Sequence, residues 1–125
     1  MPRPFLASLA PRTRRASVTI ALVAVALGGC HRKIAGGSTD GAKVFAAACA
    51  QCHGATGKPP AQLAAQLGVR DLTAAEFQAR RTRELVDHQV RRGSTNGRMP
   101  AFTGAITEAQ IAAVVDFVLA IPPAP

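Results

Sequence analysis

The chain has 125 residues and a formal net charge of +8, with 15 Lys and Arg against 7 Asp and Glu. Its length allows one small domain, and a composition without Trp or Tyr and with five Phe offers little aromatic surface for a core. The composition therefore argues against a multidomain enzyme. It favours a small domain stabilised by cross-links, a metal or a bound cofactor.

The first 29 residues have the pattern of an export signal. They contain four arginines and no acidic residue, and residues 16–29 carry no charge. A helix of that length would span about 21 Å, which is short of a hydrocarbon core of about 30 Å. We therefore predict that residues 1–29 are a signal peptide, not a membrane-spanning helix.

The end of this segment, Leu27-Gly28-Gly29-Cys30, resembles the lipobox of bacterial lipoproteins. The resemblance implies that Cys30 carries lipid, and that more than one acyl chain anchors the protein on the periplasmic side of a membrane. The alternative is ordinary cleavage near Gly28, which would leave a soluble periplasmic protein. Residues 30–39 are short, polar and glycine-containing, so we predict that they form the lipidated cysteine and a flexible tether.

Residues 40–125 are predicted to form one all-α domain, because they show helical spacing and no sustained alternation. Asp40 is the expected N-cap of a first helix that runs through two cysteines and stops near Gly54. A weaker helical segment, 61–67, follows it.

Two capping-box patterns mark later helix starts, at Thr73 and Thr107, where a Glu or Gln follows three residues on. Between them, residues 82–92 are predicted to form a helix that ends at Gly93. Its expected inward residues are Leu85, Val86 and Val90. The last helix, 107–121, is almost entirely apolar and should be buried.

The most informative stretch is Cys49-Ala50-Gln51-Cys52-His53. A C-x-x-C-H sequence is typical of c-type haem attachment. Two thiols three residues apart on a helix point the same way, so they can add to the two vinyl groups of one porphyrin. We therefore predict that Cys49 and Cys52 form the thioethers and that His53 is the proximal iron ligand.

Three other interpretations of this motif account for fewer of its residues than haem attachment does. A disulfide between Cys49 and Cys52 would leave His53 without a role. A zinc site needs four ligands, and beyond these three only His31 and His88 are available. An iron–sulfur cluster would need more cysteines than the chain has.

Beyond this motif, the sequence resembles the small class I cytochrome c family over residues 40–121. Gly41 and Phe45 lie where that family packs its first helix against its last, and Val114 and Phe117 lie where the partners occur. The resemblance implies a small class I cytochrome c-like helical domain around one covalently attached haem c.

The resemblance also indicates a distal iron ligand. The stretch from Arg98 to Phe102 looks like the family's ligand loop, and Met99 is the only methionine after the leader. The connection 93–106 that contains it is long for so small a domain. Met99 is therefore the predicted distal ligand, and His88 is the rival. A Met/His pair raises the reduction potential relative to two histidines.

The proximal histidine also needs a partner for its second ring nitrogen, which fixes the tautomer. By resemblance, the Nδ1 atom of His53 should bind the backbone carbonyl of Pro59 or Pro60.

Two strong protein ligands leave no open position on iron, so we predict electron transfer without substrate turnover, and hence no enzyme activity. The predicted function is a membrane-tethered periplasmic mono-haem c-type cytochrome that carries single electrons between respiratory redox partners. The alternative is a fixed haem c subunit of one dehydrogenase, oxidase or reductase complex. A less favoured third is a ligand sensor with a displaceable Met99.

The charge pattern bears on the partners. Six arginines cluster between residues 80 and 98: Arg80, Arg81, Arg83, Arg91, Arg92 and Arg98. They form either a solvated helix face or an electropositive rim that docks on an acidic redox protein. An exported haem domain has no access to nucleic acid, so we expect no nucleic-acid partner. We also expect the protein to be a monomer or a subunit of a respiratory complex.

Overall fold

The computed structural model describes residues 33–125, so the predicted signal peptide and Cys30 lie outside the described residues. Within this range there is no β-strand, only an isolated bridge between Thr103 and Ile106, which confirms the all-α prediction. No helix of this range is both long enough and apolar enough to cross a membrane. The elements are η1 (Ile34–Gly37), α1 (Gly41–Ala48), α2 (Ala50–His53), α3 (Ala61–Leu67), α4 (Ala75–Arg80), α5 (Arg83–Arg92) and α6 (Glu108–Ala120).

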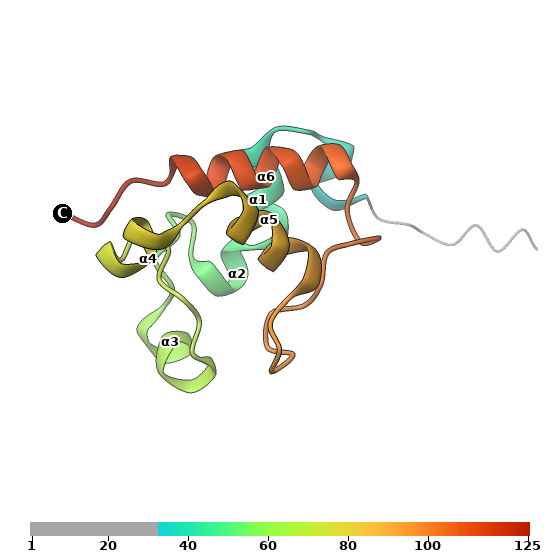
Figure 1. Ribbon diagram of the computed structural model, residues 1–125. Coiled ribbons are helices and arrows are strands. Elements are labelled where there is room, and N and C mark those ends of the chain that lie inside the picture. The colour runs from blue at the N-terminus through green and yellow to red at the C-terminus, as the bar shows by residue number, and fades with distance from the viewer. Residues whose placement is uncertain (1–32) are drawn as a thin grey trace, which may run out of the picture. The chain divides into compact units, whose positions relative to one another are not determined.

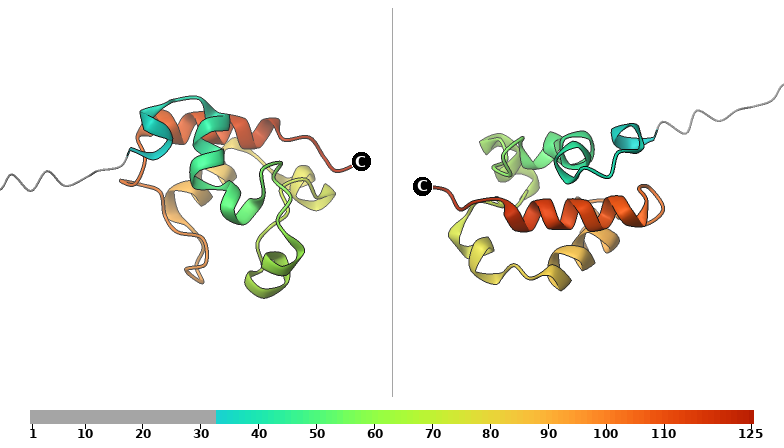
Figure 2. Two further views of the ribbon diagram at one scale, coloured as in Figure 1. Left: turned by 180° about the vertical axis from the view of Figure 1, so that it is seen from behind. Right: turned by 90° about the horizontal axis from the view of Figure 1, so that it is seen from above.

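The last helix, α6, is the element on which the others are arranged (Figure 1). It makes its main contacts with α1 and α5. Seen from above, α1, α2 and α3 lie on one side of α6, and α4 and α5 lie on the other (Figure 2). Two helices that are distant in the sequence, α1 and α5, therefore share one apolar partner.

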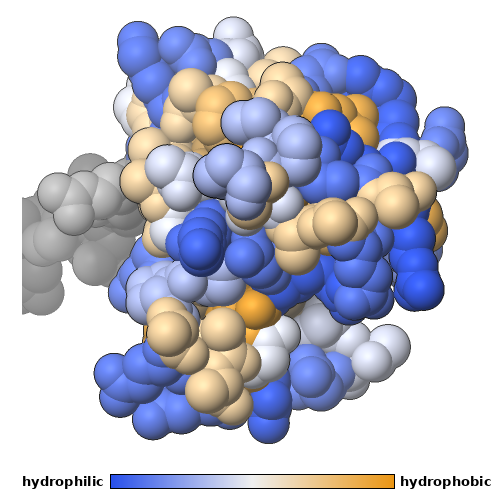
Figure 3. All heavy atoms as spheres, turned by 90° about the vertical axis from the view of Figure 1, so that its left-hand side faces the viewer, coloured by the Kyte–Doolittle hydropathy of each residue, from blue (hydrophilic) through white to orange (hydrophobic). Residues whose placement is uncertain are grey.

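The core is small and aliphatic, with one aromatic pair. Its fully buried side chains include Val44 and Phe45 of α1 and Val114 of α6. The rings of Phe45 and Phe117 lie 5.0 Å apart between centroids, at an angle of 44°. This confirms the predicted contact between the first and last helices. On the face drawn in Figure 3, hydrophilic side chains cover most of the surface and apolar ones appear as separate patches.

The two predicted capping boxes differ in outcome. At Thr107 the box is present, because its hydroxyl accepts from the Gln110 backbone while the Gln110 side chain accepts from the Thr107 backbone. At Thr73 the prediction is wrong, since α4 begins one residue later, after Ala74. The Asp71 carboxylate accepts from both the backbone and the hydroxyl of Thr73, so that hydroxyl does not cap the helix.

One inward assignment on α5 is also wrong. Val86 and Val90 are buried, as predicted, but Leu85 is 59% exposed. The two valines are four residues apart and form the narrow stripe that meets α6. Leu85 precedes that stripe by one residue, which turns it about 100° away from α6.

The prediction of a flexible tether over residues 30–39 fails for the part that the structure describes. Ile34–Gly37 form the short helix η1, and Ile34 and Ala35 pack against the core. The buried side chain of Gln110 donates to the carbonyl oxygens of Ile34 and Ser38. Residues 34–38 are therefore part of the folded domain.

The close approach of α1 to α6 leads to the first testable prediction. A Cβ atom at Gly41 would clash with the Ala113 carbonyl oxygen and lie 2.9 Å from Cβ of Phe117. Because the obstacle is backbone, Gly41→Ala must push the helices apart, and we expect it to lower the free energy of unfolding by about 1–3 kcal/mol. Chemical denaturation measures this change.

The control is Ala46→Ser, an exposed position of the same helix, for which we expect a loss below about 0.5 kcal/mol. An unchanged or raised stability in Gly41→Ala would show that the helix contact is not tight, because alanine by itself favours a helix over glycine.

Candidate functional site

The cysteine motif lies where α1 ends and α2 begins. The backbone of Cys49 departs from helical geometry at φ −118°, and α2 then forms a single turn that ends at His53. The backbone N–H of His53 donates to the Cys49 carbonyl oxygen at 2.9 Å. Gly54 ends the turn with φ 72°, a conformation that favours glycine. One helical turn thus brings Cys49, Cys52 and His53 together, as their spacing predicts.

The two thiols of this turn are free, with Cys49 half-buried and Cys52 exposed. Burial, and secondarily the neighbouring Cys52 thiol, raise the pKa of Cys49 to about 11. At neutral pH Cys49 therefore stays protonated. Neither sulfur is in a disulfide, so both are available for thioether formation.

The imidazole of His53 has one nitrogen already engaged. Its Nδ1 atom lies 3.1 Å from the backbone carbonyl oxygen of Arg70. A carbonyl only accepts, so Nδ1 carries the proton and Nε2 keeps its lone pair. Burial lowers the pKa of His53, opposed by this hydrogen bond, so the ring is neutral at pH 7.

The predicted partner of His53, a carbonyl of Pro59 or Pro60, is therefore wrong. The chain leaves these prolines through α3 and returns after Gly68, which has the left-handed backbone conformation. A hydrogen bond of 2.8 Å from the Leu72 backbone to the Gly57 carbonyl holds the returning segment beside the loop after α2. This return places Arg70 next to His53, seventeen residues along the chain.

Met99 is held in a loop whose backbone folds back on itself after α5. Ser94 donates its backbone N–H to the Met99 carbonyl at 2.9 Å, and the Met99 backbone donates to the Ser94 hydroxyl at 2.9 Å. A Cβ atom at Gly93 would collide with the Met99 carbonyl oxygen, so glycine is needed there for space as well as for its φ of 70°. Further along, Phe102 donates to the Val90 carbonyl at 3.0 Å.

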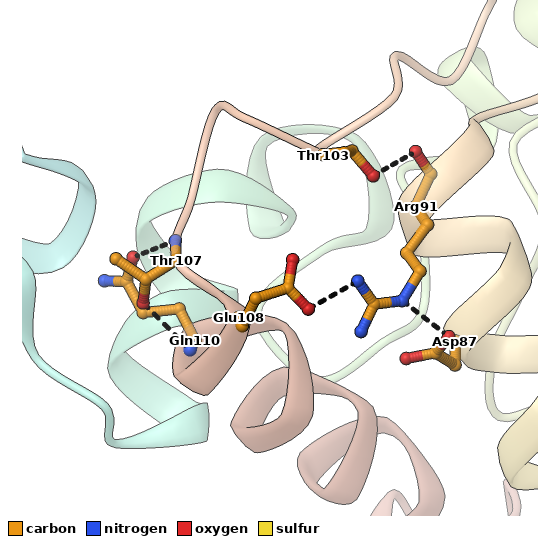
Figure 4. Close-up of polar contacts among 6 residues, drawn as sticks. All are labelled: Asp87, Arg91, Thr103, Thr107, Glu108 and Gln110. Carbon is orange, nitrogen blue, oxygen red and sulfur yellow. Dashed lines mark hydrogen bonds and ion pairs between the residues drawn. The ribbon is translucent and has the colours of Figure 1, made fainter.

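A polar cluster fixes the far end of the same loop (Figure 4). Thr103 donates its hydroxyl proton to the Arg91 carbonyl at 3.1 Å. The Arg91 side chain pairs with Asp87 of α5 and with Glu108 of α6, each at 2.7 Å. These two carboxylates raise the pKa of Arg91, with Asp87 the larger cause. The loop that contains Met99 is thus connected to both helices that flank it.

The side chain of Met99 has one polar neighbour, which sequence reasoning missed. The Nε2 atom of Gln89 lies 3.6 Å from Sδ of Met99. Gln89 is an exposed polar residue in α5, ten positions earlier, and no sequence pattern singles it out. The rival ligand His88 is exposed on the same helix.

The donor set of these residues fits a haem c group. It comprises two free thiols, an imidazole with a free Nε2 and a thioether sulfur. The helix α2 and the helix that leads into the Met99 loop, α5, lie on opposite sides of α6 (Figure 2). Residues 33–125 contain no group of three or more His, Cys, Asp or Glu side chains placed to hold a metal ion by themselves.

Most of the clustered arginines make contacts inside the domain. Arg81 donates to the Ile121 carbonyl at 2.7 Å, and Arg83 pairs with Asp116. Arg80 and Arg91 also form ion pairs. Three members have no ion pair among residues 33–125. Arg81 is one of them, and the other two, Arg92 and Arg98, are exposed.

The comparisons with known proteins indicate the same cofactor. Residues 36–118 match the family described as cytochrome c oxidase, cbb3-type, subunit III. The solved structure of KustC0563 c-type cytochrome is 30% identical, with a TM-score of 0.59 over 66% of this chain and 98% of that chain. No curated protein matches the sequence significantly. The chain therefore belongs to the cbb3-type cytochrome c oxidase subunit III family of cytochrome c domains, and it is a c-type cytochrome with covalently bound haem c.

Proposed function

We propose that this protein is a mono-haem electron carrier in which Cys49 and Cys52 hold haem c by thioethers and His53 and Met99 are the axial ligands. The observation that carries the proposal is the state of His53, a neutral imidazole with Nδ1 engaged and Nε2 free, in the same turn as two free thiols. When bound, haem c supplies the one-electron couple of its iron.

His53 is prepared for this role by its surroundings. The Arg70 carbonyl fixes the tautomer and the orientation of the ring, and burial keeps the ring neutral. No proton has to leave before Nε2 binds iron. The hydrogen bond from Nδ1 to the Arg70 carbonyl also makes Nε2 a more basic ligand.

Met99 would supply the second ligand from a backbone that Ser94 and Gly93 hold in place. A thioether raises the potential relative to a second histidine. With both axial positions filled by protein, no position is left for a substrate, so the proposed activity is electron transfer without turnover.

We further propose that residues 1–29 are a signal peptide, that Cys30 is lipidated, and that the cytochrome domain, which includes residues 34–38, works at the periplasmic surface of a membrane. The lipobox pattern before Cys30 supports this location. Arg92 and Arg98 are exposed without an ion pair within residues 33–125, and they suit docking on an acidic redox partner.

A second candidate is a haem subunit bound permanently to one respiratory complex. The family match favours it, because that family is described as a subunit of an oxidase. A carrier binds its partner weakly and in a salt-sensitive way, whereas a subunit stays bound.

Extraction of native membranes with mild detergent separates these two candidates. For a carrier, we expect the cytochrome to elute alone when the salt is raised from 50 to about 500 mM, where the screening length is only a few ångströms. Co-elution of a complete oxidase or reductase at high salt would instead establish the fixed subunit.

The axial ligand is tested by Met99→Ala in the haem-loaded protein. We expect covalent haem to remain, the weak far-red methionine-to-iron charge-transfer band to vanish, and the midpoint potential to fall, because a ligand that favours ferrous iron is removed. Absorption spectra of the oxidised protein and a redox titration measure these effects.

The matched control is His88→Ala, which should keep the band, since His88 is exposed on α5. A band that survives in Met99→Ala, or one that is lost in His88→Ala, would contradict the assignment. Native protein that already lacks the band and binds carbon monoxide would favour the sensor function.

A finer prediction concerns Gln89. Its amide donor near Sδ withdraws electron density from the thioether, so Gln89→Leu should lower the potential by about 20–60 mV, the equivalent of one weak hydrogen bond. The far-red band should shift but persist, because Met99 stays bound.

Gln66→Leu, at an exposed position of α3, is the matched control and should leave both the potential and the band unchanged. Equal potentials in Gln89→Leu and the native protein would show that this contact does not affect the ligand.

A further inference from the structure

The side chain of Gln110 is a buried polar group whose bonds all go to one short segment and its own helix cap. It is 3% exposed. Its Nε2 atom donates to the Ile34 carbonyl at 3.0 Å and to the Ser38 carbonyl at 2.9 Å, while its oxygen accepts from the Thr107 backbone at 3.1 Å. Both amide protons and the oxygen are therefore satisfied inside the protein, and breaking one bond would leave a buried group unpaired.

Gln110 holds a short segment, the strap, which comprises Ile34–Ser38. It is a compact turn, in which Gly36 donates to the Lys33 carbonyl and Ser38 donates to the Ala35 carbonyl, each at 3.0 Å. Ala35 has φ 54°, which is rare for a residue with a side chain, and such a conformation persists only where packing holds it. Ile34 and Ala35 supply that packing against the core.

The strap is also continuous with the first helix. The Ser38 hydroxyl accepts from the Asp40 backbone at 3.1 Å, and the Asp40 carboxylate caps α1. In both Figure 1 and Figure 2 the strap lies beside the N-terminal end of α6, at the opposite end of that helix from the C-terminus of the chain. It is thus tied to the two helices that pack most closely in the core.

This arrangement limits how far the domain can move from Cys30. Only residues 31–33 separate Cys30 from the strap, and a fully extended chain covers at most about 14 Å from Cys30 to Ile34. A free tether up to Asp40 would allow about 35 Å. The three intervening residues, His31, Arg32 and Lys33, include two cations that are attracted to anionic headgroups.

We propose that the strap, latched by Gln110, holds the domain on the membrane in a fixed orientation, with the N-terminal end of α6 toward the lipid surface. The inference rests on the proposed lipidation of Cys30. It identifies the partner class as redox proteins of the same membrane whose electron-transfer site lies close to its surface. A partner whose electron-transfer site cannot come close to the membrane surface is excluded.

The test uses the full-length, haem-loaded lipoprotein on supported bilayers of phosphatidylcholine and phosphatidylglycerol, with polarised absorption of the haem as the readout. A fixed domain gives a dichroic ratio different from the isotropic value. We expect this order in the native protein, and we expect its loss after insertion of ten Gly and Ser residues between Arg32 and Lys33.

Gln110→Leu is the second variant, because leucine keeps the volume but removes both donors to the strap. We expect it to lose the dichroism while keeping the haem spectrum. The insertion variant leaves the core untouched, so it decides the question if Gln110→Leu fails to fold. Gln66→Leu on α3 is the control and should keep the native dichroism.

The outcomes separate this inference from the lipid anchor on which it rests. Native protein that stays on the bilayer with isotropic haem would overturn the fixed orientation alone, as would full dichroism in the insertion variant. Equal membrane retention of the native protein and Cys30→Ala, or no retention of either, would overturn the lipid anchor and the orientation together.

Discussion

The position of the haem-binding turn depends on one close contact, the approach of α1 to α6 at Gly41. The Ala113 carbonyl of α6 occupies the space that any side chain at Gly41 would need, and the rings of Phe45 and Phe117 pack 5.0 Å apart beside it. Because α2 follows α1 after a single non-helical residue, this contact also fixes where the cysteines and His53 lie. Packing in the core thus determines the geometry of the site.

Each of the two proposed axial ligands is held in place by hydrogen bonds with neighbouring residues. The ring of His53 is oriented by the Arg70 carbonyl, and the backbone of Met99 is tied to Ser94. Ligands that are held by a supporting shell keep their geometry when the charge on a bound group changes. A domain built in this way suits electron transfer, and the strap latched by Gln110 extends the same rigidity to its proposed place on the membrane.

The sequence by itself determined the features that depend on near neighbours. Helix starts at Asp40 and Thr107 were predictable because a capping side chain bonds backbone groups two or three residues away. Gly93 marked the end of α5 for a similar reason. The C-x-x-C-H motif determined the cofactor, since its chemistry lies within one helical turn. The family resemblance then indicated which helices pack together.

Only the tertiary structure decided the features that join distant segments. The partner of His53 is the Arg70 carbonyl, because a return of the chain after α3 brings that backbone near, and backbone carbonyls have no signature in a sequence. The bonds from Gln110 to Ile34 cross 76 positions, so a stretch that looks like a flexible tether is part of the fold. Leu85 is exposed because α6 contacts only a narrow stripe of α5. Short-range patterns contain no information on which distant surface a segment meets, and that surface sets each of these outcomes.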